Sequence, residues 1–144
     1  EKTARSLGLA TSRYEAEDEK DFDRVMGEIK RAQIPGIVDL AGLAIAFPYM
    51  KVVPEFALKH RLVVVHFLRE AVEQGGLVSF GPSVVAGFRR SAYYVDRIVK
   101  GAKPSELPIE QPAVFETCVN LKTAKALGIT MPQSILLRAQ TVIG

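Results

Sequence analysis

The feature of this sequence that most constrains its fold is the alternation of short β-branched and apolar runs with helical stretches. The most continuous run, Leu62-Val63-Val64-Val65, is typical of a strand buried on both faces of a sheet. Residues 36–40 and 77–80 form similar apolar runs, separated from it by stretches with helical spacing. Strands that alternate with helices over short loops predict a mostly parallel sheet covered by helices on both faces. We therefore expect a three-layer α/β/α, Rossmann-like lobe.

The remaining elements follow from the same periodicities and from the positions of glycine and proline. Pro104, Pro108 and Pro112 predict an extended linker over residues 102–112. A doubly wound unit normally opens with its central strand, whereas this chain opens with a helical stretch, so we expect the first strand of the lobe to be missing. The predicted helices are 2–7, 20–32, 54–61, 68–73, 82–100, 121–127 and 134–143, with further strands at 9–14 and 114–119 and a loop at 42–49.

Composition excludes several classes of function. The formal net charge is +3 and the basic residues are scattered, so a nucleic-acid partner is not expected. Cys118 is the only cysteine, which excludes an intramolecular disulfide and a thiolate metal cluster. Two histidines, His60 and His66, cannot build a histidine-rich metal site by themselves. We expect neither a metal nor another cofactor.

The motifs of common catalytic sites are absent from the sequence. It contains no G-x-S-x-G, no H-E-x-x-H, no phosphate-binding loop and no G-x-G-x-x-G. Cys118 lies within an apolar run predicted to be a strand, where a buried structural thiol is favoured over a nucleophile. The chain is therefore not expected to be an enzyme.

About half of the chain resembles one known family closely. Residues 75–82, GGLVSFGP, resemble the element GGLMSYGP of a family of ABC transporter substrate-binding proteins, and residues 90–104, RSAYYVDRIVKGAKP, resemble its helix RAAYYVDRILKGAKP. Residues 106–112 and 115–128 then resemble DLPVEQP and FELVINLKTAKALG of the same family. Strings of this length are far more specific than a short motif, and the family is described as tryptophan/tyrosine-type transport components.

The resemblance implies a type I periplasmic binding protein fold, truncated here, in which two α/β lobes close on a ligand. We expect residues 1–80 to form the C-terminal lobe, and residues 81–144 to form a hinge-crossing helix, the proline-rich linker and a strand-helix tail. The implied function is non-catalytic binding of a small molecule, an amino acid or aromatic solute, for an ABC permease. The implied location is periplasmic or extracytoplasmic, with a parent that is free or lipid-anchored.

Two further expectations accompany this hypothesis. Type I binding lobes also occur in regulators, so a ligand-sensing effector domain of a transcriptional or signalling protein is the alternative function. A lobe without its first strand and its partner exposes a sheet edge and apolar surface, so we also expect self-association.

The carboxyl ends of the predicted strands supply the candidate ligand-binding residues, because open parallel sheets bind ligands there. Asp39 is expected to pair with a ligand ammonium, and Phe67 and Phe80 to stack against an apolar or aromatic ligand. The structural alternatives are a loop cap for Asp39 and core positions for the two phenylalanines. The candidates are Asp39, Leu40, Ala41, His66, Phe67, Ser79 and Phe80.

The candidate positions include departures from the family pattern. Phe80 and His66 both stand where a tyrosine is usual in the family, and Cys118 opens CVN in place of VIN. Loss of hydroxyl groups at strand ends changes which polar groups of a ligand can form hydrogen bonds with the protein. The resemblance alone therefore does not carry tryptophan or tyrosine over as the ligand.

Overall fold

The structure is a computed structural model that describes residues 2–40 and 47–144. The chain divides into two units, Glu1–Ile34 and Pro35–Gly144. The smaller unit contains helices α1 (Lys2–Ser6) and α2 (Glu19–Ala32). Both confirm the helices predicted for these stretches to within a residue. The expected loop over residues 42–49 lies mostly outside the described residues.

Helix α2 begins at a side-chain cap and is amphipathic. The carboxylate of Asp18 accepts a hydrogen bond from the Asp21 backbone N–H at 2.8 Å, which satisfies one of the free donors of the first turn. Arg24 bonds to Asp21 and Glu28, and its hydrogen bond lowers the pKa of Asp21. The apolar side chains that this helix buries are Phe22, Val25 and Ile29.

The strand predicted for residues 9–14 is wrong. These residues have no regular structure, and almost all of them are exposed. A strand exists only where a neighbour supplies hydrogen bonds, and no described residue of the smaller unit forms a strand. The residues of this stretch were therefore insufficient by themselves to predict a strand.

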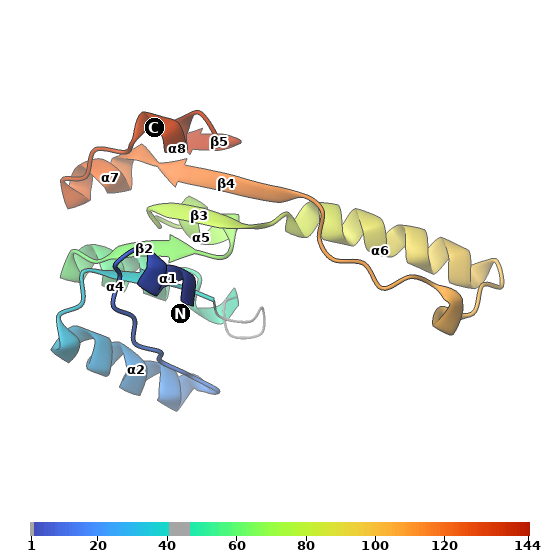
Figure 1. The fold of residues 1–144 in the computed structure, drawn as a ribbon, viewed down its shortest axis with the longest axis horizontal. Coiled ribbons are helices and arrows are strands. Elements are labelled where there is room, and N and C mark those ends of the chain that lie inside the picture. Colours follow the sequence, from blue (N-terminus) through green and yellow to red (C-terminus); the bar gives the residue numbers. More distant parts are fainter. Residues whose placement is uncertain (1, 41–46) are drawn as a thin grey trace. The chain divides into compact units, whose positions relative to one another are not determined.

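The larger unit carries a five-stranded sheet in the order β1-β2-β3-β4-β5 (Figure 1). Strands β1, β2 and β3 are parallel, β4 pairs antiparallel with β3, and β5 pairs parallel with β4. The expected mostly parallel sheet flanked by helices is confirmed. The strands are β1 (Gly36–Val38), β2 (Val63–His66), β3 (Val78–Pro82), β4 (Phe115–Asn120) and β5 (Thr141–Ile143), and the helices are α4 (Val52–His60), α5 (Arg69–Glu73), α6 (Val84–Val99), η1 (Pro104–Glu106), α7 (Leu121–Leu127) and α8 (Gln133–Leu136).

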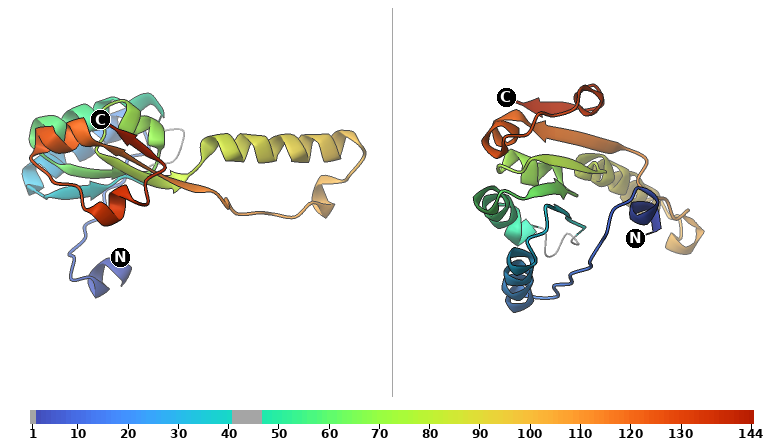
Figure 2. Two further views of the ribbon diagram at one scale, coloured as in Figure 1. Left: turned by 90° about the horizontal axis from the view of Figure 1, so that it is seen from above. Right: turned by 60° about the vertical axis from the view of Figure 1, so that its left-hand side comes forward.

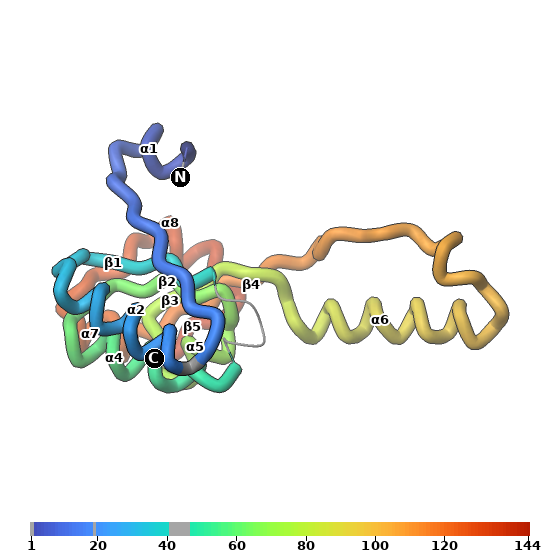
Figure 3. The backbone as a smooth tube through the Cα atoms, turned by 90° about the horizontal axis from the view of Figure 1, so that it is seen from below, coloured from blue at the N-terminus to red at the C-terminus, as the bar shows by residue number. Residues whose placement is uncertain are grey.

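Helices α4 and α5 cover one face of this sheet, and α8 lies over the other (Figures 2 and 3). Right-handed connections between successive parallel strands place α4 and α5 on the same side. Reversal of the strand direction at β4 moves the next connection to the opposite side. The face under α5 is the better covered: Val64 and His66 of β2 are buried there, whereas Val63 and Val65 are only half-buried. Strand β2 was predicted to be buried on both faces, and it is fully buried on one.

The C-terminal helix predicted for residues 134–143 is wrong in its second half. Helix α8 ends at Leu136, and residues Thr141–Ile143 form β5. The free edge of β4 accounts for the difference, because it pairs Cys118 with Thr141 and Asn120 with Ile143. An available sheet edge overrides weak helical spacing, and three consecutive β-branched residues fit such an edge well.

Helix α6 and residues 100–114 form an arm between β3 and β4 (Figure 1). The guanidinium of Arg90 makes two hydrogen bonds to the carboxylate of Glu110, at 2.7 and 2.5 Å, and lowers its pKa. Tyr94 donates its hydroxyl to the carbonyl of Pro108 at 2.8 Å, and the Arg90 guanidinium lies 4.0 Å from the ring centre of Tyr93. These contacts hold the expected proline-rich linker along one side of α6.

The start of α7 is tied to the α5–β3 connection by a polar clasp. Asn120 accepts a hydrogen bond from the Thr123 backbone N–H at 3.1 Å and donates one to the Val72 carbonyl at 3.3 Å. The Thr123 hydroxyl donates to the carbonyl of Gly75 at 2.9 Å. Asn120 and Thr123 are buried, so these hydrogen bonds satisfy polar groups that water cannot reach.

We expect Asn120→Ala to lower the free energy of unfolding by about 2 kcal/mol, because it removes the cap of α7 and one of the two hydrogen bonds that the Val72 carbonyl accepts, leaving only that from the Gly75 N–H. Asn120→Ser keeps a cap acceptor and loses the amide donor without adding a charge, so its stability should lie between those of the unmodified protein and Asn120→Ala. Urea unfolding monitored by circular dichroism measures both. Equal stabilities for all three proteins would contradict the role given to the clasp.

Candidate functional site

Three parallel strands bring their carboxyl ends to one edge of the sheet, where most of the predicted site residues lie. The β1–β2 ladder pairs Val38 with Val65, and the Asp39 N–H continues it by donating to the Val65 carbonyl at 2.9 Å. The β2–β3 ladder pairs His66 with Ser79. Asp39, His66 and Ser79 are thus neighbours across three adjacent strands, and in-register neighbours share a face of the sheet.

The polar members of this edge differ strongly in exposure. The side chain of His66 is 1% exposed, and that of Asp39 is 21% exposed. The imidazole Nδ1 lies 3.5 Å from Asp39 Oδ2, slightly beyond an ordinary hydrogen bond. Ser79 is as buried as His66, and its hydroxyl has no hydrogen-bond partner among the described residues. Only Asp39 of the three presents a substantial part of its side chain to solvent.

A glycine makes room for the buried imidazole. A Cβ placed on Gly76 would lie 2.7 Å from both Nε2 and Cδ2 of His66, and 2.9 Å from the Ala71 carbonyl oxygen. Contacts this short do not occur for real Cβ atoms, so the ring of His66 packs directly against the glycine backbone. The face of His66 away from Asp39 is therefore closed by α5 and the loop that follows it.

Aspartate, histidine and serine are the residue types of a hydrolytic triad, but this geometry does not build one. In a triad the imidazole bonds to the carboxylate through one nitrogen and to the nucleophilic hydroxyl through the other. Here Nε2 lies against Gly76, and Ser79 accepts no bond from it. Both His66 and Ser79 are closed to a substrate by their burial. The arrangement can orient a carboxylate, and it cannot activate a hydroxyl.

The apolar members of the edge are more accessible. Phe80 is 60% exposed and stacks on Phe115, with ring centres 5.6 Å apart and planes inclined by 23°. Leu40 is also exposed, while Phe67 is half-buried and its carbonyl oxygen crosses close to Gly81. The edge therefore combines one accessible carboxylate with an accessible aromatic pair.

Phe115 was not among the predicted site residues. It lies at the first position of β4, and its place beside Phe80 follows from the antiparallel register that pairs Pro82 with Phe115. The sequence gives no direct indication of this pairing. Ala41, the remaining predicted residue, lies outside the described residues. Ligand contact by each of the seven predicted residues stays a prediction.

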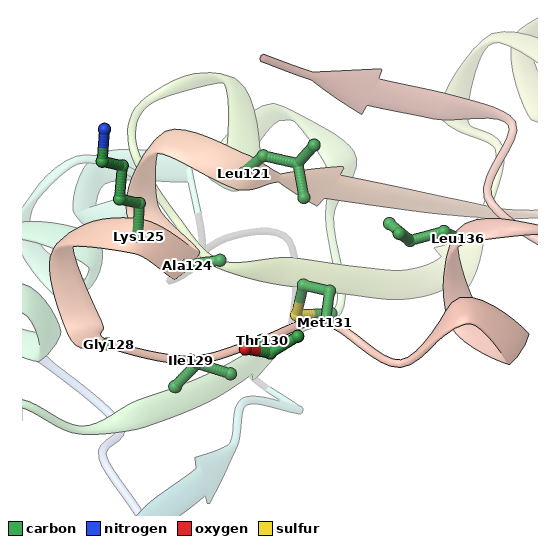
Figure 4. A pocket seen from close by; sticks show the side chains of 8 residues that line it. All are labelled: Leu121, Ala124, Lys125, Gly128, Ile129, Thr130, Met131 and Leu136. Carbon is green, nitrogen blue, oxygen red and sulfur yellow. The ribbon is translucent and has the colours of Figure 1, made fainter.

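An apolar groove of about 470 Å³ lies between α7 and α8 (Figure 4). It follows the carboxyl end of β4, which runs antiparallel to β3, so it belongs to the end of the sheet opposite Asp39. It is open to solvent and carries a single charged residue, Lys125. The groove is therefore separate from the candidate edge. Its lining residues are Leu121, Ala124, Lys125, Gly128, Ile129, Thr130, Met131 and Leu136.

The match to a protein family decides where this chain belongs. A family model described as ABC transporter substrate binding protein matches residues 1–143. The chain belongs to the ABC transporter substrate-binding protein family. The resemblance inferred from the sequence is confirmed, and no curated protein matches the chain. Within residues 2–40 and 47–144, none of the helices is long and apolar enough to cross a bilayer.

Solved structures similar to this family member support the same fold. A conserved domain protein from Vibrio cholerae O1 biovar El Tor is 22% identical with a TM-score of 0.86, and the match covers 97% of this chain and 47% of that chain. The ABC domain from Streptococcus pneumoniae, solved in complex with L-Trp, is 23% identical with a TM-score of 0.83, covering 97% and 48%. An adhesive substrate-binding protein from Clostridium difficile, in its ligand-free, open form, is 17% identical with a TM-score of 0.61, covering 99% and 47%. The chain thus spans just under half the length of each of these proteins.

We expect Gly81→Ala to lower the free energy of unfolding by about 2 kcal/mol, because the new methyl group would collide with the Phe67 backbone and force β2 from β3. Gly87→Ala is the matched control, since a Cβ there meets no atom within 4 Å. Urea unfolding compares the two, and ¹H–¹⁵N spectra should localise the Gly81 effect to the strand ends. A Gly81→Ala protein as stable as the control would contradict the close approach at this edge.

Proposed function

We propose that this family member is a solute-binding lobe that presents a small molecule to an ABC permease and performs no catalysis. The observation that carries the proposal is the edge at the ends of β1, β2 and β3, with one accessible carboxylate and a stacked aromatic pair. Ligands of parallel α/β sheets bind beyond these strand ends. The buried state of His66 and Ser79 is consistent with binding without bond breaking.

The ligand class proposed from this edge is an amino acid with an apolar or aromatic side chain. Asp39 would receive the ammonium group, and Phe80 with Phe115 would face the apolar part. The backbones of Asp39 and Phe80 lie two strand spacings apart, about 10 Å, and the Phe80 side chain lies on the face opposite to that of Ser79 because side chains alternate along β3. The bound L-Trp of the Streptococcus pneumoniae structure supports this class. Phenylalanines offer stacking without hydroxyl groups, so they favour an apolar ring over a phenol.

We propose that residues 1–80 act as one lobe and that residues 81–144 carry the hinge crossings, with α6 reaching a second lobe. An apolar stripe on α6 supports this: its members repeat with alternating spacings of three and four residues, the pattern of a helix that packs against another surface. No residue of α6 is buried, and Phe88 is 74% exposed. The stripe consists of Val85, Phe88, Ala92, Val95 and Val99.

The proposed setting is extracytoplasmic, with a parent protein that is free or anchored by a lipid. A binding lobe of an ABC importer works where it can collect solute and dock on the permease. The proposed partners are therefore the small molecule and the ABC permease of the same system.

We expect L-tryptophan to bind the chain weakly and to shift the amide signals around Asp39, Phe80 and Phe115 in ¹H–¹⁵N spectra, because one lobe supplies half of the contacts. Asp39→Asn should weaken this binding about tenfold, since it removes the charge opposite the ammonium. Glu55→Gln, which removes an exposed carboxylate from α4, should leave binding unchanged. Shifts spread evenly over the chain, or an unchanged affinity in Asp39→Asn, would refute the proposed site.

We expect the chain to self-associate through the α6 stripe when no second lobe covers it, as sedimentation equilibrium can measure. Phe88→Glu should weaken the association constant about a hundredfold, because a charge replaces a large apolar contact. Arg97→Glu is the control, since it places glutamate at an exposed position on another side of the same helix. A monomer at all concentrations would contradict self-association.

A further inference from the structure

We propose that the groove between α7 and α8 is a docking site for a segment of a partner protein that carries acidic residues next to an apolar face. The groove lies at the end of the sheet opposite Asp39, so this site is separate from the edge proposed to bind a solute. The inference therefore does not depend on the proposed function.

The apolar part of the groove is already ordered. Two of its lining residues, Ile129 and Met131, pack against the buried hydrophobic cluster to which α7 contributes. The chain turns into this stretch at Gly128, which ends α7 in a left-handed conformation with φ of 74°. The Ile129 N–H then donates to the Ala124 carbonyl at 2.9 Å. Docking on such a surface costs little conformational entropy on this side of the interface.

One end of the groove is cationic. Lys125 and Gly128 lie at that end, and Leu136 lies at the other (Figure 4). Arg61, which follows α4, reaches the cationic end, because its Nη2 lies 3.8 Å from the position that a Cβ on Gly128 would take. Lys122 lies about one turn before Lys125 on α7. Positive charge therefore gathers beside Gly128, while the rest of the lining carries no charge.

No described carboxylate pairs with the cations at this end. Arg61, Lys122 and Lys125 are exposed, and none of them forms an ion pair or a side-chain hydrogen bond among the described residues. The segments that carry them, residues 56–69 and 117–144, contain no aspartate or glutamate. A partner that brings carboxylates would thus gain attraction here without breaking an existing ion pair.

Helix termini alone do not account for these cations. Helices α4 and α7 both end near this site, and cations are favourable at helix C-termini. The carbonyls of Leu58 and Lys125, however, already accept hydrogen bonds from the backbone N–H groups that follow each helix. The charged ends of the Arg61 and Lys125 side chains are therefore left for another partner.

The shape of the groove favours a protein segment over a membrane surface. The groove is a hollow of about 470 Å³ that is open to solvent. A bilayer surface would meet the rim first and leave the hollow uncovered. The apolar side chains of an amphipathic segment enter such a groove, as helices do in the helix-in-groove mode of recognition. The cations at one end then select a segment whose carboxylates lie at one end of its apolar face.

The first test adds a synthetic amphipathic peptide, with two glutamates at one end and leucines along one face, to the 144-residue chain. We expect ¹H–¹⁵N shifts confined to α7, α8, the loop between them and Arg61. A peptide with glutamines in place of the glutamates should bind about fivefold more weakly, because two exposed ion pairs are lost. A peptide with alanines in place of the leucines should not bind. Equal affinities for the glutamate and glutamine peptides, or shifts elsewhere in the chain, would overturn the proposal.

The second test changes the protein. Arg61→Gln combined with Lys125→Gln should weaken binding of the glutamate peptide about fivefold and leave binding of the glutamine peptide unchanged. Arg89→Gln combined with Arg97→Gln is the control, because it removes the same charge from exposed positions of α6 that form no ion pair among the described residues. Equal losses in the two double variants would show a nonspecific effect of charge and contradict the assigned site.

A third measurement separates the acidic segment from a lipid surface. Vesicles of phosphatidylglycerol are sedimented with the chain, and we expect Arg61→Gln with Lys125→Gln to leave the vesicle-bound fraction unchanged. Loss of vesicle binding in this double variant, without binding of the glutamate peptide, would assign the cations to a membrane and overturn the proposal. Absence of binding to the peptide and to the vesicles would overturn it as well.

Discussion

The antiparallel pairing of β3 with β4 is the constraint on which the rest of the larger unit depends. The ladder runs from Val78 with Val119 to Pro82 with Phe115, so it holds the strand that leaves the sheet against the strand that returns. Everything between the two strands must therefore form an arm that starts at the carboxyl ends of β1, β2 and β3. The same ladder places Phe115 beside Phe80 and sends α7 to the opposite end of the sheet. Site edge and arm are two consequences of one set of hydrogen bonds.

Local periodicity was enough to predict most elements of this fold, and it failed where a neighbour decides the outcome. Helices α2, α6 and α7 have strong amphipathic spacing or clear caps, so their prediction needed no tertiary information. The short strand β5 depends on the free edge of β4, which the sequence does not display. The segment at 9–14 was predicted to be a strand, but no partner strand lies among the described residues of its unit. Pairing, unlike periodicity, is a property of two distant segments.

The residues of the candidate edge were also predictable in part, because their position follows from the order of the strands and their burial does not. Parallel strands collect their carboxyl ends at one edge, so the rule that names Asp39 and Phe80 needs only the strand order. It cannot say which strand-end residues are covered. The burial of His66 depends on Gly76, ten residues later, and on the clasp that positions that loop. Phe115 depends on the return of the chain after the arm, which only the β3–β4 register reveals.

The exposed stripe of α6 and the half-buried carboxylate of Asp39 have a common physical basis under the proposed function. A lobe that docks on the stripe would bury apolar surface, which is favourable with or without ligand. Closure of that lobe over Asp39 would bury a charge, which is unfavourable until an ammonium neutralises it. Docking is thus independent of the solute, while closure depends on it. Under the proposed function, such a receptor would keep its two lobes in contact without solute and would close, in the form that a permease recognises, only when the solute is bound.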